Sequence, residues 1–261
     1  MRPNKLREKL DAGEPTISTH IHSPWPAIVE LIGHTGIYDY VEYVAEYGTF
    51  DLHALDNMCR AAELYDMGMM FKIDKSSQHY LSQRAIGSGF GSILFTDCRT
   101  VEDAEECVRI TRPDTPEDKG LYSVYARRNT YPGYGGSKEY VEAMKKTVVN
   151  LMIEKKEAVE NLEGILSVPG VDMVQWGPSD YSMSIGKAGE RGDPAILDAK
   201  KEVFQTALSM GIPPRAEIGS PDDAKEYLDM GVRHFSMGTD TSILFSWWKN
   251  NGDELQKALG R

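Results

Sequence analysis

Residues 148–176 read VVNLMIEKKEAVENLEGILSVPGVDMVQW, and this stretch decides the fold class. An apolar run from Val148 ends at Glu154, a short helical segment begins at Lys156, and a second apolar run covers 173–176. We predict a strand over 150–154, a helix after it and a second strand over 173–176. Two strands that flank a helix in this way form a β–α–β unit, whose strands are parallel.

The alternation of strand-like and helix-like segments continues outward in both directions, with short connections. Further strands are predicted at residues 16–22, 40–46, 69–73, 92–96, 213–217 and 234–237. Helices are predicted at residues 27–33, 52–66, 101–112 and 196–210. Thr100 is expected to cap the third of these helices, and Ser220 followed by Pro221 is expected to open another.

Glycine marks several of the connections. Gly68, Gly211 and Gly231 each follow a methionine between a helix and the next strand, where a left-handed cap is expected. Eight strand–helix alternations without a break in composition predict an α/β fold, a single-domain (β/α)8 barrel over residues 1–261. A doubly wound open sheet is the alternative, because periodicity alone does not exclude it.

The composition fits one large domain and narrows the range of partners. The chain has 261 residues, 41% of them hydrophobic, which suffices for a sizeable core. Its 40 acidic residues outnumber the 29 basic ones, which argues against a nucleic-acid partner because phosphate binding needs a basic surface. Three cysteines, without metal-knuckle spacing, favour free thiols in a cytoplasmic protein. No apolar run has the length of a signal peptide or a membrane span.

Carboxylates are frequent where the predicted strands end, which is where β/α barrels place their reactive groups. Glu154 ends an apolar run, and a carboxylate is costly to bury unless it is paired or bound to a metal. Asp180 follows a tight turn after the next strand. Two such carboxylates suit an octahedral Mg²⁺ or Mn²⁺. Their spacing also allows Glu154 to pair with Lys155 or Lys72, and Asp180 to cap a helix.

Several short motifs carry a family resemblance. They are LMIEK at 151–155, GIL at 164–166, VPGVD at 168–172, GPSDYS at 177–182 and MGTDT at 237–241. Together they resemble the HpcH/HpaI aldolase/citrate lyase family, from about residue 16 to residue 245. The glutamate followed by a Gly-Pro-x-Asp turn is the most specific feature. The resemblance implies a class II aldehyde-lyase that binds pyruvate or a related oxo acid on a divalent metal, either Mg²⁺, Mn²⁺ or Co²⁺.

The resemblance also implies roles for individual residues. Glu154 and Asp180 would be the metal ligands, and Glu46 would lie near the water ligands of the metal. Lys72 falls where the family has an arginine that stabilises the enolate oxygen. The substrate carboxylate would meet the backbone of the turn at Gly177, Pro178 and Ser179. Trp176 would line the pocket, and Arg127 in the long loop would contact the substrate. A surface role for Arg127 is equally open.

This chain departs from the family where the proton is transferred. Tyr47 falls at the position of the family's catalytic histidine, and the aspartate that supports that histidine is missing. His20 and His22 lie two residues apart on the first predicted strand, so both rings face the same side and either is a candidate base. Tyr47 is a further candidate if the metal and Lys72 depress its pKa.

The function predicted from these residues is aldol cleavage or formation of a hydroxy-oxo acid through a pyruvate-type enolate held on the metal. The partners would be a small oxo acid and an aldehyde. A decarboxylase on the same metal site and a barrel that binds an oxo acid without reaction remain alternatives. The His-x-His pair at 20–22 also resembles the amidohydrolases, but the further histidines of that class are missing.

Two segments stand apart from the barrel pattern. Residues 113–136 are rich in Gly, Pro, Tyr and Arg, and a loop of that length is usually functional, so we expect it near the site. Residues 242–261 form an expected C-terminal helical segment that contains Trp247 and Trp248. The resemblance implies a homo-oligomer, a hexamer or a trimer, with the last helix exchanged between subunits.

Overall fold

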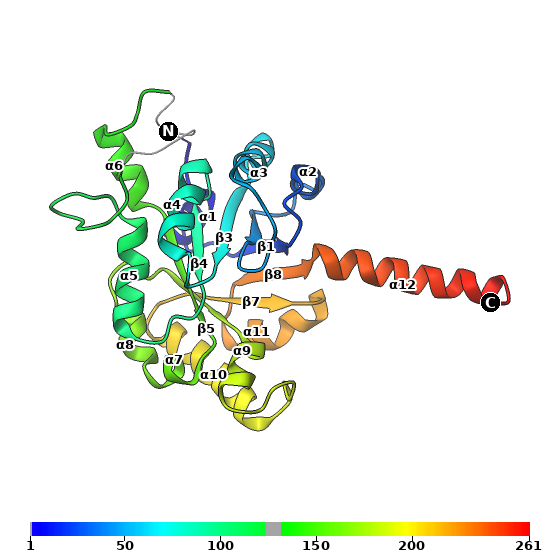
Figure 1. Ribbon diagram of the computed structural model, residues 1–261. Helices are drawn as coiled ribbons and strands as arrows, with labels where there is room; N and C mark the ends of the chain where they lie inside the picture. Colours follow the sequence, from blue (N-terminus) through cyan, green and yellow to red (C-terminus); the bar gives the residue numbers. More distant parts are fainter. Residues whose placement is uncertain (1, 124–131) are drawn as a thin grey trace.

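The computed structural model describes residues 2–123 and 132–261, and its centre is a closed barrel of parallel strands (Figure 1). The strands follow one another around the barrel in chain order, and the first pairs with the last. This confirms the (β/α)8 prediction over the open-sheet alternative. The strands are β1 (Thr16–Ile21), β2 (Tyr40–Val44), β3 (Gly68–Ile73), β4 (Ser92–Phe95), β5 (Val148–Ile153), β6 (Met173–Trp176), β7 (Pro214–Ile218) and β8 (His234–Thr239).

Helices surround the barrel in the order that the sequence predicts. The four predicted helices correspond to α2 (Pro26–His34), α3 (Leu52–Leu64), α5 (Val101–Thr111) and α10 (Pro194–Ser209). The remaining ones are α1 (Lys5–Asp11), α4 (Gln78–Ser88), α6 (Lys138–Lys145), α7 (Lys156–Glu160), α8 (Leu162–Leu166), α9 (Pro178–Ser184), the 3₁₀ helix η1 (Pro221–Asp223), α11 (Ala224–Met230) and α12 (Asp240–Ala258).

The predicted caps at Thr100, Gly211 and Gly231 are confirmed, as is the helix start at Ser220, whereas the predicted cap at Gly68 is wrong. Thr100 caps α5, where its hydroxyl accepts a hydrogen bond from the Asp103 N–H at 3.2 Å. Gly211 and Gly231 have φ angles of +76° and +103°. Gly68, however, is the first residue of β3, and Asp66 takes the left-handed conformation at φ +57°. Because α3 ends at residue 64, the left-handed position falls earlier, on a residue type that tolerates it.

Strand β2 ends earlier than predicted. The sequence predicts a strand through residue 46, but β2 ends at Val44, and Glu46 and Tyr47 lie in the turn that follows. The turn places both side chains above the barrel rim, where they meet the end of β3.

A short N-terminal helix, α1, closes the opposite end of the barrel. Its only buried side chain, Leu6, packs with Tyr40, Met70 and Val148 from three different strands. Asn4 caps the helix by accepting a hydrogen bond from the Arg7 N–H at 3.3 Å. Its two apolar residues, Leu6 and Leu10, are too few to predict a helix by periodicity alone.

The middle of the barrel is polar, although barrel interiors are usually filled with branched apolar side chains. Arg215 on β7 is fully buried, and its guanidinium donates hydrogen bonds to Glu42, Gln175 and Ser18. Gln175 in turn donates to Glu217 at 2.7 Å. This network joins side chains of β1, β2, β6 and β7 inside the barrel.

The last helix, α12, leaves the barrel and extends away from it (Figure 1). Trp247 and Trp248 are each 63% exposed on this helix. No helix in residues 2–123 or 132–261 is long and apolar enough to cross a membrane.

Candidate active site

A buried lysine anchors one side of the barrel mouth. Lys72 lies near the C-terminal end of β3. Its ammonium is 2.8 Å from the Glu46 carboxylate and 3.1 Å from the Tyr47 hydroxyl. Burial opposes the charged form of Lys72, but the carboxylates of Glu42 and Glu46 raise its pKa far above the usual range. The site therefore holds a permanent positive charge beside the turn after β2.

Tyr47 does not have the depressed pKa that a proton carrier would need. Burial of its hydroxyl raises the pKa, and the nearby Lys72 ammonium offsets this only in part. Its ring is otherwise exposed at the mouth of the barrel. Lys72 alone therefore does not lower the pKa of Tyr47 below its ordinary value, and a lowering by Lys72 together with a bound metal stays a prediction.

The two histidines of β1 have different surroundings. The His20 ring lies between Thr239 and Ser236: Nε2 is 2.6 Å from the Thr239 hydroxyl and Nδ1 is 3.4 Å from the Ser236 hydroxyl. His22 is fixed through its backbone N–H, which donates to Asp240 at 2.9 Å. Among the described residues, its ring has no hydrogen-bond partner.

The His22 ring faces the mouth of the barrel. Its centroid is 6.1 Å from the ring of Tyr47, edge to face, and 6.0 Å from that of His20. Burial and the neighbouring His20 lower the pKa of His22 below 6.5. The imidazole is therefore neutral near pH 7 and has free ring nitrogens, as a general base requires.

Glu154 follows β5 and is only 2% exposed. One carboxylate oxygen accepts a hydrogen bond from the Asp97 N–H at 2.8 Å. The other lies against Gly177, where an added Cβ would meet it at 2.8 Å. Burial raises the pKa of Glu154 to about 7, and repulsion from Asp180 adds to this.

Asp180 lies in the first turn of α9, and Lys155 binds it. The Lys155 ammonium is 2.7 Å from the Asp180 carboxylate and 3.1 Å from that of Asp97. Lys72 pairs with Glu46 instead. The alternative in which Lys155 or Lys72 neutralises Glu154 is therefore not what the structure shows: within the described residues, Glu154 forms no ion pair.

This donor set fits a divalent cation. Glu154 and Asp180 offer hard carboxylate oxygens from neighbouring strand ends, and Glu154 is a buried carboxylate without a counter-charge in contact. Residues 2–123 and 132–261 contain no cluster of three or more metal-ligating side chains. The protein would thus supply two ligands, and water and substrate oxygens the others, which is common for Mg²⁺.

Of the residues assigned to substrate binding, those of the turn after β6 lie beside Glu154, whereas Trp176 lies in the core. Gly177 and Pro178 begin α9 beside Glu154, and the Ser179 hydroxyl accepts a hydrogen bond from Arg191 at 2.5 Å. Trp176 is buried in the main core with its ring 4.7 Å from that of Tyr181, so it packs outside the barrel instead of lining the mouth. Arg127 lies outside the described residues.

The HpcH/HpaI aldolase/citrate lyase family model matches residues 50–246. The chain belongs to this family. A 5-keto-4-deoxy-D-glucarate aldolase of Escherichia fergusonii is 25% identical over 258 residues, which cover 98% of both chains. A 4-hydroxy-2-oxo-heptane-1,7-dioate aldolase of Escherichia coli is 27% identical over 92% of this chain and 90% of its own. An HpcH/HpaI aldolase from Desulfitobacterium hafniense DCB-2 superposes with a TM-score of 0.85 at 20% identity and 96% coverage of both chains.

Membership in the HpcH/HpaI family confirms the prediction of an aldolase, a carbon–carbon lyase. The family in general uses a divalent metal and acts on small oxo acids. The amidohydrolase alternative is therefore wrong. The ring of His20 is held between hydroxyl groups of β8, which further separates this site from a histidine-rich metal centre.

Sequence reasoning missed several residues that shape the site. Arg215 and Gln175 lie within predicted strands, and charged or amide side chains in an otherwise apolar strand were the available signal. Lys155 was considered only as a partner of Glu154. The turns after β4 and β6 decide which carboxylate Lys155 contacts. The spacing of these residues in the sequence does not predict the conformation of the turns.

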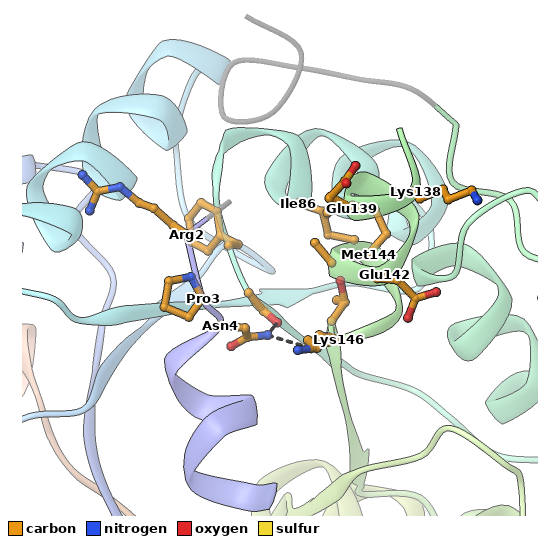
Figure 2. Close-up of a pocket in the computed structure, with 13 residues that line it drawn as sticks. Arg2, Pro3, Asn4, Ile86, Lys138, Glu139, Glu142, Met144 and Lys146 are labelled. Carbon is orange, nitrogen blue, oxygen red and sulfur yellow. Dashed lines mark hydrogen bonds between the residues drawn. The ribbon is translucent and has the colours of Figure 1, made fainter. Parts of the chain in front are cut away.

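A separate cavity of about 500 Å³ lies at the other end of the barrel, between the N-terminal segment, α4 and α6 (Figure 2). The side-chain amide of Asn4 donates to the carbonyls of Gly91 and Lys146 there, at 2.6 and 2.8 Å. Cations such as Arg2 and carboxylates such as Glu139 both line it. None of the candidate site residues that the structure describes lines this cavity.

Proposed function

We propose that this chain is a divalent-metal-dependent aldolase that cleaves or forms a hydroxy-oxo acid, with Glu154 and Asp180 as metal ligands. The observation that carries the proposal is the buried Glu154 carboxylate, which has a pKa of about 7, lies beside a second carboxylate and forms no ion pair within the described residues. A bound divalent cation supplies positive charge that stabilises the developing enolate and orients the substrate oxygens.

The protein's own groups would position the substrate around this centre. The backbone of residues 177–179, at the turn beside Glu154, would receive the substrate carboxylate. Glu46 holds the Lys72 ammonium at the mouth of the barrel. Its permanent positive charge would there stabilise the negative charge of the enolate. Lys72 forms a single-point contact where an arginine would offer a planar fork.

His22 is the base that the geometry favours. In the cleavage direction, a neutral ring nitrogen of His22 would take the proton of the substrate hydroxyl as the carbon–carbon bond breaks and the aldehyde forms. His20 would act as a support, since both of its ring nitrogens lie near hydroxyl groups of β8. The free ring and lowered pKa of His22 support this assignment over Tyr47.

The substrate would be a hydroxy-oxo acid that yields a small oxo acid and an aldehyde. The two named relatives are aldolases of 5-keto-4-deoxy-D-glucarate and of 4-hydroxy-2-oxo-heptane-1,7-dioate, both dicarboxylic acids. A decarboxylase is the second candidate, favoured by Tyr47 at the turn after β2. Loss of carbon dioxide from an oxo diacid needs a stabilised enolate but no base for a hydroxyl proton.

The first experiment follows exchange of the methyl protons of pyruvate with deuterated water by NMR, with and without Mg²⁺, Mn²⁺ or Co²⁺. Metal-dependent exchange in the wild type, lost in Glu154→Gln and Asp180→Asn, is the expected result. Exchange that persists in both variants would overturn the assignment of the metal ligands. No exchange, with release of carbon dioxide from an oxo diacid, would favour the decarboxylase.

The apolar side chains of α12 support a homo-oligomer, which we propose to be a trimer or hexamer. Six large apolar residues are exposed on this projecting helix and would be covered by another copy: Ile243, Leu244, Phe245, Trp247, Trp248 and Leu255. Light scattering that shows only monomers would contradict this. The three free thiols, all buried, also support a reducing compartment such as the cytoplasm.

A further inference from the structure

The side chain of Lys155 lies between two carboxylates at the rim. It directly follows Glu154, and its ammonium contacts Asp180 at 2.7 Å and Asp97 at 3.1 Å. The side chain is only 13% exposed, so it is held in place and does not extend freely into solvent. One ammonium therefore contacts a proposed metal ligand and a second carboxylate that no step of the proposed reaction uses.

Asp97 is itself fixed by the proposed metal site. It follows β4 with a left-handed φ of +54°, a conformation that aspartate tolerates better than most residues other than glycine. Its N–H donates to Glu154 at 2.8 Å, and its carboxylate lies 3.7 Å from the guanidinium of Arg99. The turn thus holds the Asp97 carboxylate within reach of Lys155 whether or not Asp180 changes partner.

We propose that Lys155 competes with the divalent cation for Asp180, and that its ammonium transfers fully to Asp97 when the cation binds. This inference rests on the metal site proposed above. An ammonium and a divalent cation repel each other when both contact one carboxylate oxygen. Because Asp97 already lies 3.1 Å from the same nitrogen, Lys155 can leave Asp180 without becoming unpaired.

The exchange has two physical consequences. Before metal binds, Lys155 neutralises Asp180 and so reduces the repulsion between the two ligand carboxylates. When metal binds, one ion pair of a largely buried lysine is given up, which weakens the apparent affinity. The loss of one such pair corresponds to about a tenfold change in the dissociation constant.

The test is calorimetric titration of Mn²⁺ into the full chain after dialysis against a chelator, without substrate. Lys155→Met keeps the length of the side chain and removes the charge, and it should bind Mn²⁺ about tenfold more tightly than the wild type. Lys156→Met is the matched control, because the adjacent Lys156 pairs with Glu160 at 3.5 Å and with no other carboxylate of the described residues. The control should leave the affinity unchanged.

Asp97→Asn tests the second half of the exchange. It should weaken Mn²⁺ binding more in the wild-type background than in Lys155→Met, because only in the wild type does the ammonium need Asp97. Circular dichroism melts confirm that each variant is folded. Unchanged or weaker binding in Lys155→Met, or equal tightening in Lys156→Met, would overturn the inference.

Failure of the metal site gives a different result. If the wild type does not bind Mn²⁺, or if Glu154→Gln and Asp180→Asn bind it as well as the wild type does, the proposed site itself is wrong. If binding needs both carboxylates but Lys155→Met has no tighter affinity, only the competition is refuted.

Discussion

Replacing Glu154 with glutamine should stabilise the metal-free protein while abolishing metal binding. The Glu154 carboxylate is almost fully buried, and burial raises its pKa from 4.5 to about 7. Between these two values the folded chain binds more protons than the unfolded chain, so the free energy of unfolding falls as the pH rises. Above pH 7 the ionised Glu154 carboxylate lowers the free energy of unfolding by its full amount.

The magnitude follows from the pKa difference. At about 1.4 kcal/mol for each pH unit, the difference between 4.5 and about 7 corresponds to about 3 kcal/mol. Glutamine has nearly the same shape and carries no charge, so Glu154→Gln avoids this cost. We expect the variant to be more stable than the wild type by up to about 3 kcal/mol at pH 8, and nearly equal to it at pH 4.5.

The assay is urea denaturation in the presence of a chelator at pH 4.5 and pH 8, at one protein concentration. Glu157→Gln is the matched control, because Glu157 is exposed on α7 and, among the described residues, pairs with Arg99 alone, at 3.4 Å. Its effect should stay within about 0.5 kcal/mol at both pH values. A Glu154→Gln variant that is less stable than the wild type at pH 8 would refute the reasoning. Added Mn²⁺ should then stabilise the wild type and Glu157→Gln but not Glu154→Gln.

Three further predictions concern the proton transfer and the enolate. His22→Gln should lower kcat by about a hundredfold or more. In the wild type the rate should fall on the acid side below pH 6.5, because the pKa of His22 is lowered, and the variant should lose this fall. An unchanged fall in rate at acid pH would assign the base to another residue. Lys72→Met should lower the rate of pyruvate proton exchange by about a hundredfold, as loss of a stabilising charge does, while Mn²⁺ affinity stays within a few-fold; exchange at the wild-type rate would exclude Lys72 from enolate stabilisation. Tyr47→Phe should retain kcat within a few-fold, and a loss as large as that of His22→Gln would make Tyr47 the proton carrier.

The fold could be predicted because its signals are local and repeated. The run that ends at Glu154, the caps at Thr100 and Gly211 and the alternation of segments each depend on neighbouring residues only. The exceptions have clear causes. Helix α1 has a single buried residue, and the left-handed residue before β3 moved to Asp66 because α3 ends early.

The candidate site was predictable as a set of residues but not as a set of partners. The barrel topology brings the strand ends together, so their side chains could be named from the sequence. Which ammonium contacts which carboxylate depends on the turns after β2, β4 and β6. The sequence therefore left open whether Lys72 or Lys155 neutralises Glu154, whereas the structure pairs them with Glu46 and Asp180.

Most of the buried charges in the barrel interior and at its mouth are paired, whereas Glu154 contacts no cation among the described residues. Arg215 pairs with Glu42, Lys72 with Glu46, and Lys155 with Asp180, so each of these cations already has a carboxylate in contact. Burying a charge without a partner is far more costly than burying a pair, and a fold selected only for stability would place a neutral residue after β5. Within residues 2–123 and 132–261 no cation contacts the carboxylate at position 154, and this supports its proposed role as a metal ligand.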